Sequence, residues 1–217
     1  FPMFLNSGLN LYAKWHIISE GTQGLIYSLL PSGSSYAVSG YEGDAETVIV
    51  PATYKGKLVT AIAANAFASK TYIKEIVIPQ TVTEIGSYAF SGSFDAIMRL
   101  ENVVFEQTKL NKIGDYAFQY CFLLKNIELP RTLQSIGNGA FNNCLSLEEI
   151  FIPQNVSYIG AYAFTNCGSL KKIDTDTSNP YFSSQNGVLY DKDGKTLIKY
   201  PAAKNDTHYS INAQTEY

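Results

Sequence analysis

Apolar residues recur along this chain with a fixed period. The period is marked by the dipeptide Ala-Phe, whose phenylalanines are 23, 28, 23 and 23 residues apart. An isoleucine stands five positions before each Phe, and a valine or leucine stands three positions before each of those isoleucines. A fixed interval of this length is typical of a solenoid, in which one supersecondary unit is stacked many times. The dipeptides are Ala66-Phe67, Ala89-Phe90, Ala117-Phe118, Ala140-Phe141 and Ala163-Phe164.

The first part of each unit predicts a short strand. Its apolar side chains alternate, so both ends of the segment face the core. A proline follows directly and ends the strand, because it cannot donate to the ladder. One coil cannot bury its apolar side alone, and we expect neighbouring coils to stack at an inter-strand spacing of about 4.8 Å. The clearest segments are Ile76-Val77-Ile78, Ile127-Glu128-Leu129 and Ile150-Phe151-Ile152, followed by Pro79, Pro130 and Pro153.

The second part of each unit predicts a sharp bend and then about one helical or 3-10 turn. A glycine follows the aligned isoleucine in four units, where a Cβ would be unwelcome. The tetrapeptides SYAF, DYAF, NGAF and AYAF come directly after it. The 28-residue step holds five extra residues, four in SGSFDAIMRL and one between Val103 and Ile113. The glycines are Gly86, Gly114, Gly137 and Gly160.

The combined motif resembles the BspA-like leucine-rich-repeat family. Leu147 to Asn155 follows L-x-x-I-x-I-x-x-N, and the whole unit follows LP-x-x-L-x-x-I-G-x-x-A-F-x-x-C-x-x-L. The first two units depart from it, with Ala63 in place of glycine and Lys70 and Ser93 in place of cysteine. The resemblance implies an α/β leucine-rich-repeat solenoid of short parallel strands with single helical or 3-10 turns.

The changes of pattern divide the chain into four segments. Residues 24–46 alternate around PSGSS and predict a β-hairpin that caps the open N-terminal end of the stack, where core and strand edge would otherwise be exposed. Residues 47–175 contain about five coils. Residues 176–217 break the period and predict a hairpin insertion, of the kind that BspA-like arrays carry at NGVLY, and the start of a further repeat.

Residues 1–23 are interpreted as a linker or the remnant of an upstream module. LNLYAKW resembles the last strand of the β-grasp B-repeat of bacterial surface proteins, and the alternative is an isolated amphipathic strand. The chain starts at Phe1, and we interpret it as a processed or trimmed piece of a longer protein.

Composition narrows the function classes. The formal net charge of −3 argues against a nucleic-acid surface. No apolar run reaches the length of about 18 residues that a membrane-spanning helix needs, and no signal peptide is visible. We therefore expect no membrane insertion of this segment, and we expect a monomer.

One column of side chains is the candidate binding surface. Middle positions of the predicted strands point away from the core, and most of those in this column are apolar. Exposed contiguous apolar surface usually marks an interaction site; the alternative is that strand propensity alone selects these residues. The column consists of Ile49, Val77, Val104, Glu128, Phe151 and Asp174. A second column, Tyr88, Tyr116 and Tyr162, is assigned to packing rather than to ligand contact.

Candidates for metal binding or catalysis are few. Cys121, Cys144 and Cys167 occupy one repeat position and predict a ladder of small buried thiols, with a metal or disulfide site as the alternative. Asp191-x-Asp193-Gly194 predicts a turn, since a calcium loop would need a closing Glu where Ala202 stands. The two histidines, His16 and His208, have no partners at a recognisable spacing. We predict no enzyme activity and no cofactor.

Two functions follow as hypotheses. BspA-like proteins are often surface adhesins, so the resemblance implies a non-catalytic binding module of a secreted or cell-surface protein. Its ligand would be a protein or glycan of the host matrix, of a host cell or of a neighbouring cell. The alternative is a structural spacer of a multidomain envelope protein that binds no ligand of its own.

Overall fold

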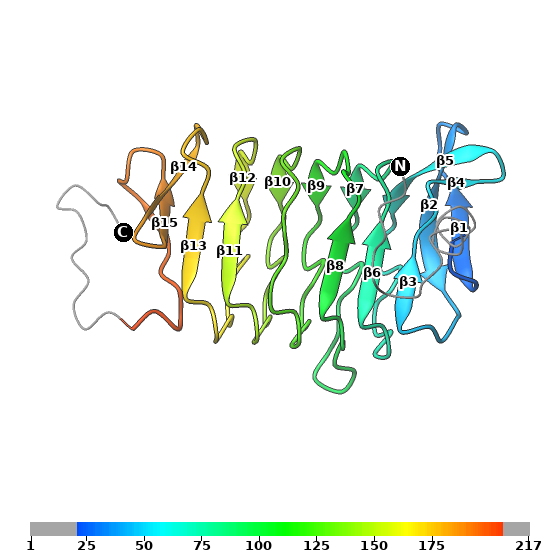
Figure 1. The fold of residues 1–217 in the computed structure, drawn as a ribbon, viewed down its shortest axis with the longest axis horizontal. Helices are drawn as coiled ribbons and strands as arrows, with labels where there is room; N and C mark the ends of the chain where they lie inside the picture. Colours follow the sequence, from blue (N-terminus) through cyan, green and yellow to red (C-terminus); the bar gives the residue numbers. More distant parts are fainter. Residues whose placement is uncertain (1–20, 206–217) are drawn as a thin grey trace, which may run out of the picture.

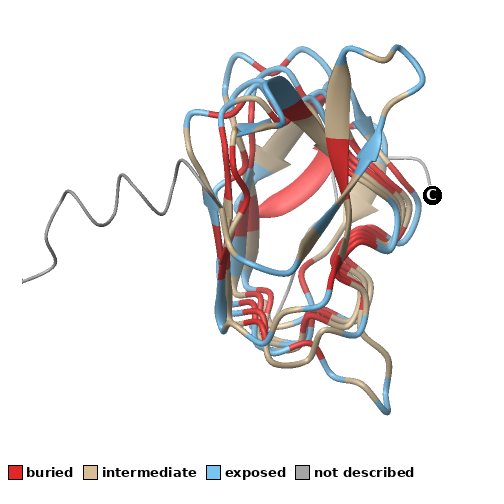
Figure 2. Cartoon of the chain, turned by 90° about the vertical axis from the view of Figure 1, so that its right-hand side faces the viewer, coloured by how far each residue is buried: buried red, intermediate tan, exposed pale blue. Residues whose placement is uncertain are grey.

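Successive coils lie side by side along one axis, with corresponding strands in parallel register (Figure 1). The computed structural model describes residues 21–205. Looking along that axis, the buried positions of one coil repeat at the same places in the next (Figure 2). The fixed period therefore predicted the architecture correctly: a parallel β-solenoid of the leucine-rich-repeat type.

One side of the solenoid carries a continuous sheet in the order β1-β2-β5-β7-β9-β10-β12, with β4 paired to β5. Its repeat strands are only two residues long after β5, yet they pair in register from coil to coil, for example Ile85 with Ile113. The bounds are β1 Leu25–Leu29, β2 Ser35–Tyr41, β4 Thr53–Tyr54, β5 Lys57–Ile62, β7 Glu84–Ile85, β9 Lys112–Ile113, β10 Ser135–Ile136 and β12 Tyr158–Ile159.

The strands of the other side are called the front ladder here: β3, β6, β8, β11 and β13. They form two separate parallel sheets, β3-β6-β8 and β11-β13. The bounds are β3 Thr47–Ile49, β6 Glu75–Ile78, β8 Asn102–Phe105, β11 Glu149–Ile152 and β13 Lys172–Thr175. Beyond them, β14 (Phe182–Gln185), β15 (Val188–Asp191) and β16 (Leu197–Lys199) form an antiparallel sheet of three strands.

A column of phenylalanine rings forms the centre of the core. The rings stack face to face along the axis, with centroids 5.1 to 5.8 Å apart and interplanar angles of 2 to 11°. Tyr41 of β2 extends this column beyond Phe67 at 5.9 Å. The rings are those of Phe67, Phe90, Phe118, Phe141 and Phe164, and all are buried.

The helical or 3-10 turns predicted at the Ala-Phe tetrapeptides are wrong: the described residues contain turns there and no helix. The residue before each Ala has a positive φ, for example 58° at Tyr88 and 55° at Gly139, which a right-handed helix cannot contain. The backbone bonds instead to the next coil, as from the Phe118 N–H to the Ala140 carbonyl at 2.8 Å.

The predicted capping hairpin over residues 24–46 is not supported as a separate element. β1 and β2 pair antiparallel, but β2 also pairs in parallel with β5, so the two strands are the terminal members of the continuous sheet. The physical reason is that β2 has the same backbone direction and register as the coil beside it, for example Tyr36 opposite Val59.

The strand predicted at Ile127–Leu129 is absent, and residues 126–130 have no strand assignment. This segment follows the coil with the five extra residues. In that coil the chain turns after β8 at Gln107, whose φ is 44°. The alternation of Ile127, Glu128 and Leu129 is retained, since Ile127 and Leu129 are buried and Glu128 is exposed, but in the described chain this segment makes no backbone hydrogen bond to β8 or β11.

The backbones of consecutive coils touch at a column of glycines, called the glycine column here: Gly86, Gly114, Gly137 and Gly160. A Cβ on Gly137 would lie 2.5 Å from the Gly114 carbonyl carbon and 2.6 Å from the Asp115 nitrogen. Gly137 has no positive φ, so it is required for this close approach of two coils and not for a special backbone conformation.

Candidate binding face

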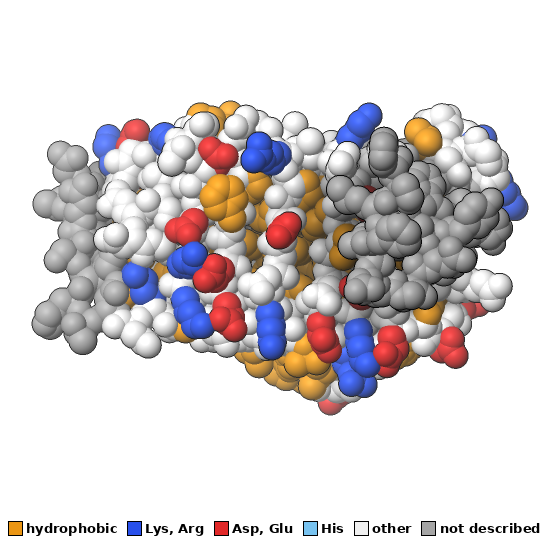
Figure 3. Space-filling view, viewed as in Figure 1, with side chains coloured by type: hydrophobic (Ala, Val, Ile, Leu, Met, Phe, Trp, Pro, Cys, Tyr) orange, Lys and Arg blue, Asp and Glu red, His pale blue; other side chains and the backbone are white. Residues whose placement is uncertain are grey.

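The candidate column lies on the outward side of the front ladder. Pairing places Ile49 beside Val77 and Val77 beside Val104 in one sheet, and Phe151 beside Asp174 in the other. Val104 is 42% exposed and Phe151 51% exposed. Ile49, Val77 and Asp174 are half-buried, and Glu128 is exposed in the segment between the two sheets. Figure 3 shows apolar side chains gathered across the middle of this face.

The front ladder is interrupted between β8 and β11. Within residues 21–205, no backbone hydrogen bond joins residues 126–130 to either of these strands. The last bond before the interruption on the β11 side runs from the Glu148 N–H to the Lys125 carbonyl at 3.0 Å. The backbone edges of β8 and β11 therefore both face a segment that does not pair with them.

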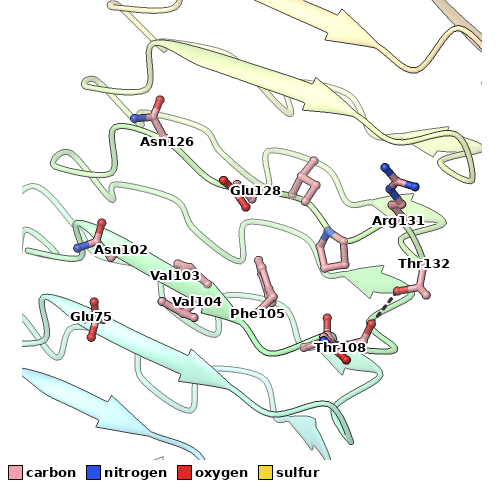
Figure 4. A pocket seen from close by; sticks show the side chains of 13 residues that line it. Glu75, Asn102, Val103, Val104, Phe105, Thr108, Asn126, Glu128, Arg131 and Thr132 are labelled. Carbon is pink, nitrogen blue, oxygen red and sulfur yellow. Dashed lines mark hydrogen bonds between the residues drawn. The ribbon is translucent and has the colours of Figure 1, made fainter. Parts of the chain in front are cut away.

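A groove of about 840 Å³ opens at this interruption. One wall comes from β8 and the other from residues 126–132; Figure 4 shows Val104 and Phe105 on the first and Glu128 and Arg131 on the second. Two core positions, Val103 and Leu129, line its floor and are each 9% exposed, whereas their equivalents Ile76 and Ile152 in regular coils are 0% exposed.

A second groove of about 450 Å³ continues from the first toward β13. The two share Asn126, Glu128 and Leu129. Phe151 and Asp174 line the second groove, so four residues of the candidate column border the two hollows: Val104, Glu128, Phe151 and Asp174. Ile49 and Val77 lie outside both.

Charged side chains form an alternating row beside the strands, in the order Glu46, Lys74, Glu101, Lys125, Glu148 and Lys171. The residues at each end of the row form ion pairs, with Nζ–Oε2 distances of 2.8 Å for Lys74–Glu46 and 2.6 Å for Lys171–Glu148. The hydrogen bond from Lys171 lowers the pKa of Glu148. Among the described residues, Glu101 and Lys125 have no ion pair, so the row is also interrupted at the groove.

The acidic groups at the groove differ in their partners. Lys172 Nζ lies 3.0 Å from Glu149 and 3.4 Å from Asp174, and the hydrogen bonds to these two carboxylates raise the pKa of Lys172. Glu75 and Glu128 have no ion pair within residues 21–205. The groove is therefore lined by two carboxylates without an ion pair in the described chain and by one cation, Arg131.

One buried hydroxyl at the groove is unsatisfied. Thr108 is 5% exposed, and its Oγ1 has no hydrogen-bond partner among the described residues. The Thr108 carbonyl does accept a hydrogen bond from Thr132 Oγ1 at 3.1 Å (Figure 4). A buried polar atom without a partner needs a physical account, because it carries a desolvation penalty.

The insertion after the second Ala-Phe forms an apolar patch that sequence reasoning missed. Phe94 is 72% exposed and its ring lies 4.8 Å from that of Tyr120, which in turn contacts Phe122 at 5.8 Å. The loop of residues 92–99 projects below the coils in Figure 1, and apolar side chains gather at the same edge in Figure 3. A signal was present in the sequence, since the extra residues include Phe94 and Ile97.

The tyrosine column is broken by Gly139. The rings of Tyr88 and Tyr116 stack at 5.1 Å, and a Cβ on Gly139 would lie 2.3 Å from the Tyr116 ring. Tyr162, beyond the glycine, is 69% exposed. These rings lie along the turns of the coils and not on the candidate binding face.

The three cysteines are free and buried, as the ladder interpretation predicts. Each Sγ donates to the Phe carbonyl of an earlier coil, for example Cys144 to Phe118 at 3.2 Å. Burial raises the pKa of Cys167 to about 11 and that of the other two thiols further. The part of the chain that the structure describes holds no group of His, Cys, Asp and Glu that could bind a metal ion.

Other sequence predictions have mixed outcomes. Asp191 ends β15 and Asp193 lies in the turn that follows, where Asp191 Oδ1 accepts from the Lys195 N–H at 2.7 Å. The histidines, the B-repeat resemblance over residues 1–16 and the strand predicted at 209–217 lie outside the described residues. From residue 21 to residue 205, no helix long and apolar enough for a bilayer is present.

Comparison with known proteins agrees with this fold. A family model described as "BspA type Leucine rich repeat region" matches residues 60–186 in six copies. No curated protein matches the chain significantly.

Solved structures of bacterial leucine-rich repeat proteins are similar. A Treponema pallidum (T. pallidum) leucine-rich repeat protein is 29% identical, with a TM-score of 0.67 over 72% of this chain and 71% of its own. The pneumococcal vaccine antigen PcpA is 27% identical, with a TM-score of 0.67 over 89% of this chain and 58% of its own. A leucine-rich repeat protein from Eubacterium ventriosum is 25% identical, with a TM-score of 0.69 over 92% and 54%.

Proposed function

The chain belongs to the BspA-type leucine-rich repeat family, and from this premise we propose that it is the non-catalytic binding module of a secreted or cell-surface protein. The face of the front ladder contacts a protein or glycan on host matrix, host cells or neighbouring cells. The chain spans little more than half of two of its structural relatives, 58% and 54%, so this function is that of one segment.

One observation supports this assignment above the others. The candidate column presents exposed apolar side chains, Val104 and Phe151, on the two parallel sheets of the front ladder, next to two hollows. Leaving such groups in water is unfavourable, and covering them with a partner recovers about 25 cal/mol for each Å² of apolar surface removed from water. A repeat solenoid is generally an interaction scaffold rather than an enzyme, which also favours binding.

The test is binding of the chain to an array of immobilised matrix proteins and glycans. Phe151→Asp and Val77→Asp should weaken binding by about tenfold or more if the column is the contact surface. Tyr158→Asp is the matched control, because Tyr158 is 50% exposed but lies on the continuous sheet. Melting temperatures of all variants are measured alongside, so that unfolding is not mistaken for loss of contact.

A structural spacer is the alternative, and the same experiment separates the two functions. Binding that Phe151→Asp weakens and Tyr158→Asp leaves unchanged supports the binding module. Absence of binding to every protein and glycan in the array supports the spacer. Equal weakening by both variants would place the contact surface elsewhere on the coils.

A further inference from the structure

The interruption of the front ladder leaves two backbone edges that face each other across an unpaired segment. In regular coils the edge of each strand is closed by the next strand, as β6 is by β8 and β11 by β13. At residues 126–130 no such bonds form on either side within the described chain. Backbone N–H and C=O groups are obligatory hydrogen-bonding groups, and unpaired strand edges are templates for another strand.

The groove runs along this unpaired edge. Its walls are β8 on one side and residues 126–132 on the other, and its floor reaches the core positions Val103 and Leu129. A volume of about 840 Å³ lies within the range of about 300–1,000 Å³ that ligand sites occupy. The unsatisfied Thr108 hydroxyl lies at the end of the same groove and would gain a partner if a polar ligand entered and the side chain turned toward it.

We propose that the groove between β8 and residues 126–132 is a docking site for an extended peptide segment of a protein partner, which adds a strand to the β8 edge and carries a basic residue. This proposal rests on the proposed function and narrows it from a protein or glycan ligand to a peptide. A polypeptide supplies backbone donors and acceptors at the strand spacing, which is the requirement of β-strand addition. A glycan has no such periodic backbone.

Charge complementarity selects the side chains of the peptide. Glu75 and Glu128 border the groove without an ion pair in the described chain, and Arg131 is the one cation that lines it, so acidic groups outnumber basic ones there. Glu128 projects from the middle of one wall (Figure 4). A lysine or arginine opposite Glu128 would compensate its charge, and an opposite charge at an interface steers and orients a partner.

The apolar lining sets the alternation. Val103 and Leu129 line the floor of the groove, so we expect apolar side chains on the inward face of the peptide strand and basic side chains on its outward face, where Glu128 is exposed. Successive side chains of a strand point to opposite faces. The recognised pattern is therefore an alternating apolar and basic segment.

The experiment uses the whole chain and a short synthetic peptide in which valine and lysine alternate. Binding is followed by NMR shifts of backbone amides. Three control peptides are used: valine alternating with glutamate, the same composition with all lysines before all valines, and the alternating peptide with every second backbone nitrogen methylated. The expected result is shift changes confined to residues 102–108 and 126–132. Each control should bind about tenfold or more weakly.

Two protein variants sharpen the test. Glu128→Lys should weaken binding of the valine-lysine peptide and strengthen binding of the valine-glutamate peptide. Asp193→Lys is the control with the same change of charge, because Asp193 is exposed in the turn between β15 and β16. Deletion of Gln107 returns the coil to the regular spacing between strands and should abolish binding by closing the groove. Its folding is checked by the melting temperature.

The outcomes test the binding module and the peptide groove separately. If the methylated peptide binds as well as the parent, or if the shifts fall outside the groove, strand addition here is wrong. If proteins of the array bind and Glu128→Lys leaves that binding unchanged, the binding module stands and the peptide groove is wrong. If no protein or glycan binds in the array while the peptide does, the broader assignment to glycan or matrix ligands is wrong and the groove stands.

Discussion

The continuous sheet and the front ladder are made by the same coils, yet only one of them is unbroken. Repeat strands of two residues, such as β9 and β10, hold register through the coil with five extra residues, while the longer strands β8 and β11 are separated. Strand length therefore does not determine continuity here. The contacts between neighbouring coils determine whether a sheet continues from one coil to the next.

The continuous sheet leads directly into the glycine column and the phenylalanine column. Gly137 allows consecutive backbones to touch, and Phe118 and Phe141 stack at 5.3 Å, so the spacing between coils is fixed by atoms that cannot be rearranged independently. The front ladder has no equivalent column at its outer face. The coil that forms the β8 wall of the groove carries one extra residue between Val103 and Ile113.

The largest expected effect comes from breaking the phenylalanine column. Phe141→Ala should lower the free energy of unfolding by about 3–5 kcal/mol, because a stacked buried ring is lost and a cavity remains. Phe164→Ala should lower it less, since Phe164 has one stacked ring neighbour in the described chain and Phe141 has two. Urea unfolding of both variants measures the difference.

The structure also changes the expectation of which end of the phenylalanine column contributes less to stability. The sequence suggests that Phe67 is a terminal ring, so that Phe67→Ala should matter less than Phe141→Ala. Tyr41 covers Phe67 at 5.9 Å, and Phe67 is fully buried. A loss for Phe164→Ala that equals or exceeds the loss for Phe141→Ala would contradict the nearest-neighbour account of the stack.

The next effect concerns the close approach of coils beside the continuous sheet. Gly137→Ala should destabilise by about 1–3 kcal/mol, because the new Cβ overlaps backbone atoms of the preceding coil and forces them apart. Gly168→Ala is the matched control, since a Cβ there meets no atom within 4 Å and the φ of Gly168 is not positive. Thermal unfolding of the two variants should separate them; equal melting temperatures would refute the role of the column.

The thiol ladder predicts how the core responds to alkali. Burial raises the pKa of Cys167 to about 11 from an ordinary value of 9.0, so the folded state keeps the proton that the unfolded state releases. Stability from this group is complete below pH 9 and is lost as the pH rises toward 11. Urea unfolding between pH 8 and pH 11 should show this decline, and a Cys167→Ala variant should show a smaller one.

A smaller effect of opposite sign is expected in acid. The hydrogen bond and charge of Lys171 lower the pKa of Glu148 below 4.5, so this pair stabilises the fold above that pH and ceases to do so as the pH falls through the lowered pKa. Both side chains are about half exposed, at 58% and 45%, and such surface pairs contribute little. Glu148→Gln should therefore leave the melting temperature at pH 7 almost unchanged.

The sequence was sufficient for the stack because the Ala-Phe positions carry their own register. The five rings, the buried cysteines and the outward column of the front ladder all follow from that alignment. The turns were mispredicted because a short segment after a glycine bend is compatible with one helical or 3-10 turn, while the backbone has a positive φ at Tyr88, Tyr116 and Tyr162. The glycine at position 139 and the asparagine at position 65, which occupy the same place in other coils, were a signal of that conformation.

The interruption of the front ladder and the groove could not be predicted from the sequence, for a different reason. IELP at residues 127–130 has the same alternation as IFIP at residues 150–153, and only the second forms a strand. The two segments differ in the coil that precedes them, because only the coil before IELP carries an extra residue between its front strand and the aligned isoleucine. A local pattern cannot report the register of the neighbour on which pairing depends.

Hydrogen exchange of backbone amides tests the comparison most directly. The amides of residues 135–137, which pair in the continuous sheet, should be protected close to the level of global unfolding, while those of residues 126–129 should exchange about tenfold or more faster. Deletion of Gln107 should slow exchange at residues 126–129 and leave residues 135–137 unchanged. Equal protection of the two segments in the unaltered chain would contradict an interrupted front ladder beside a continuous sheet.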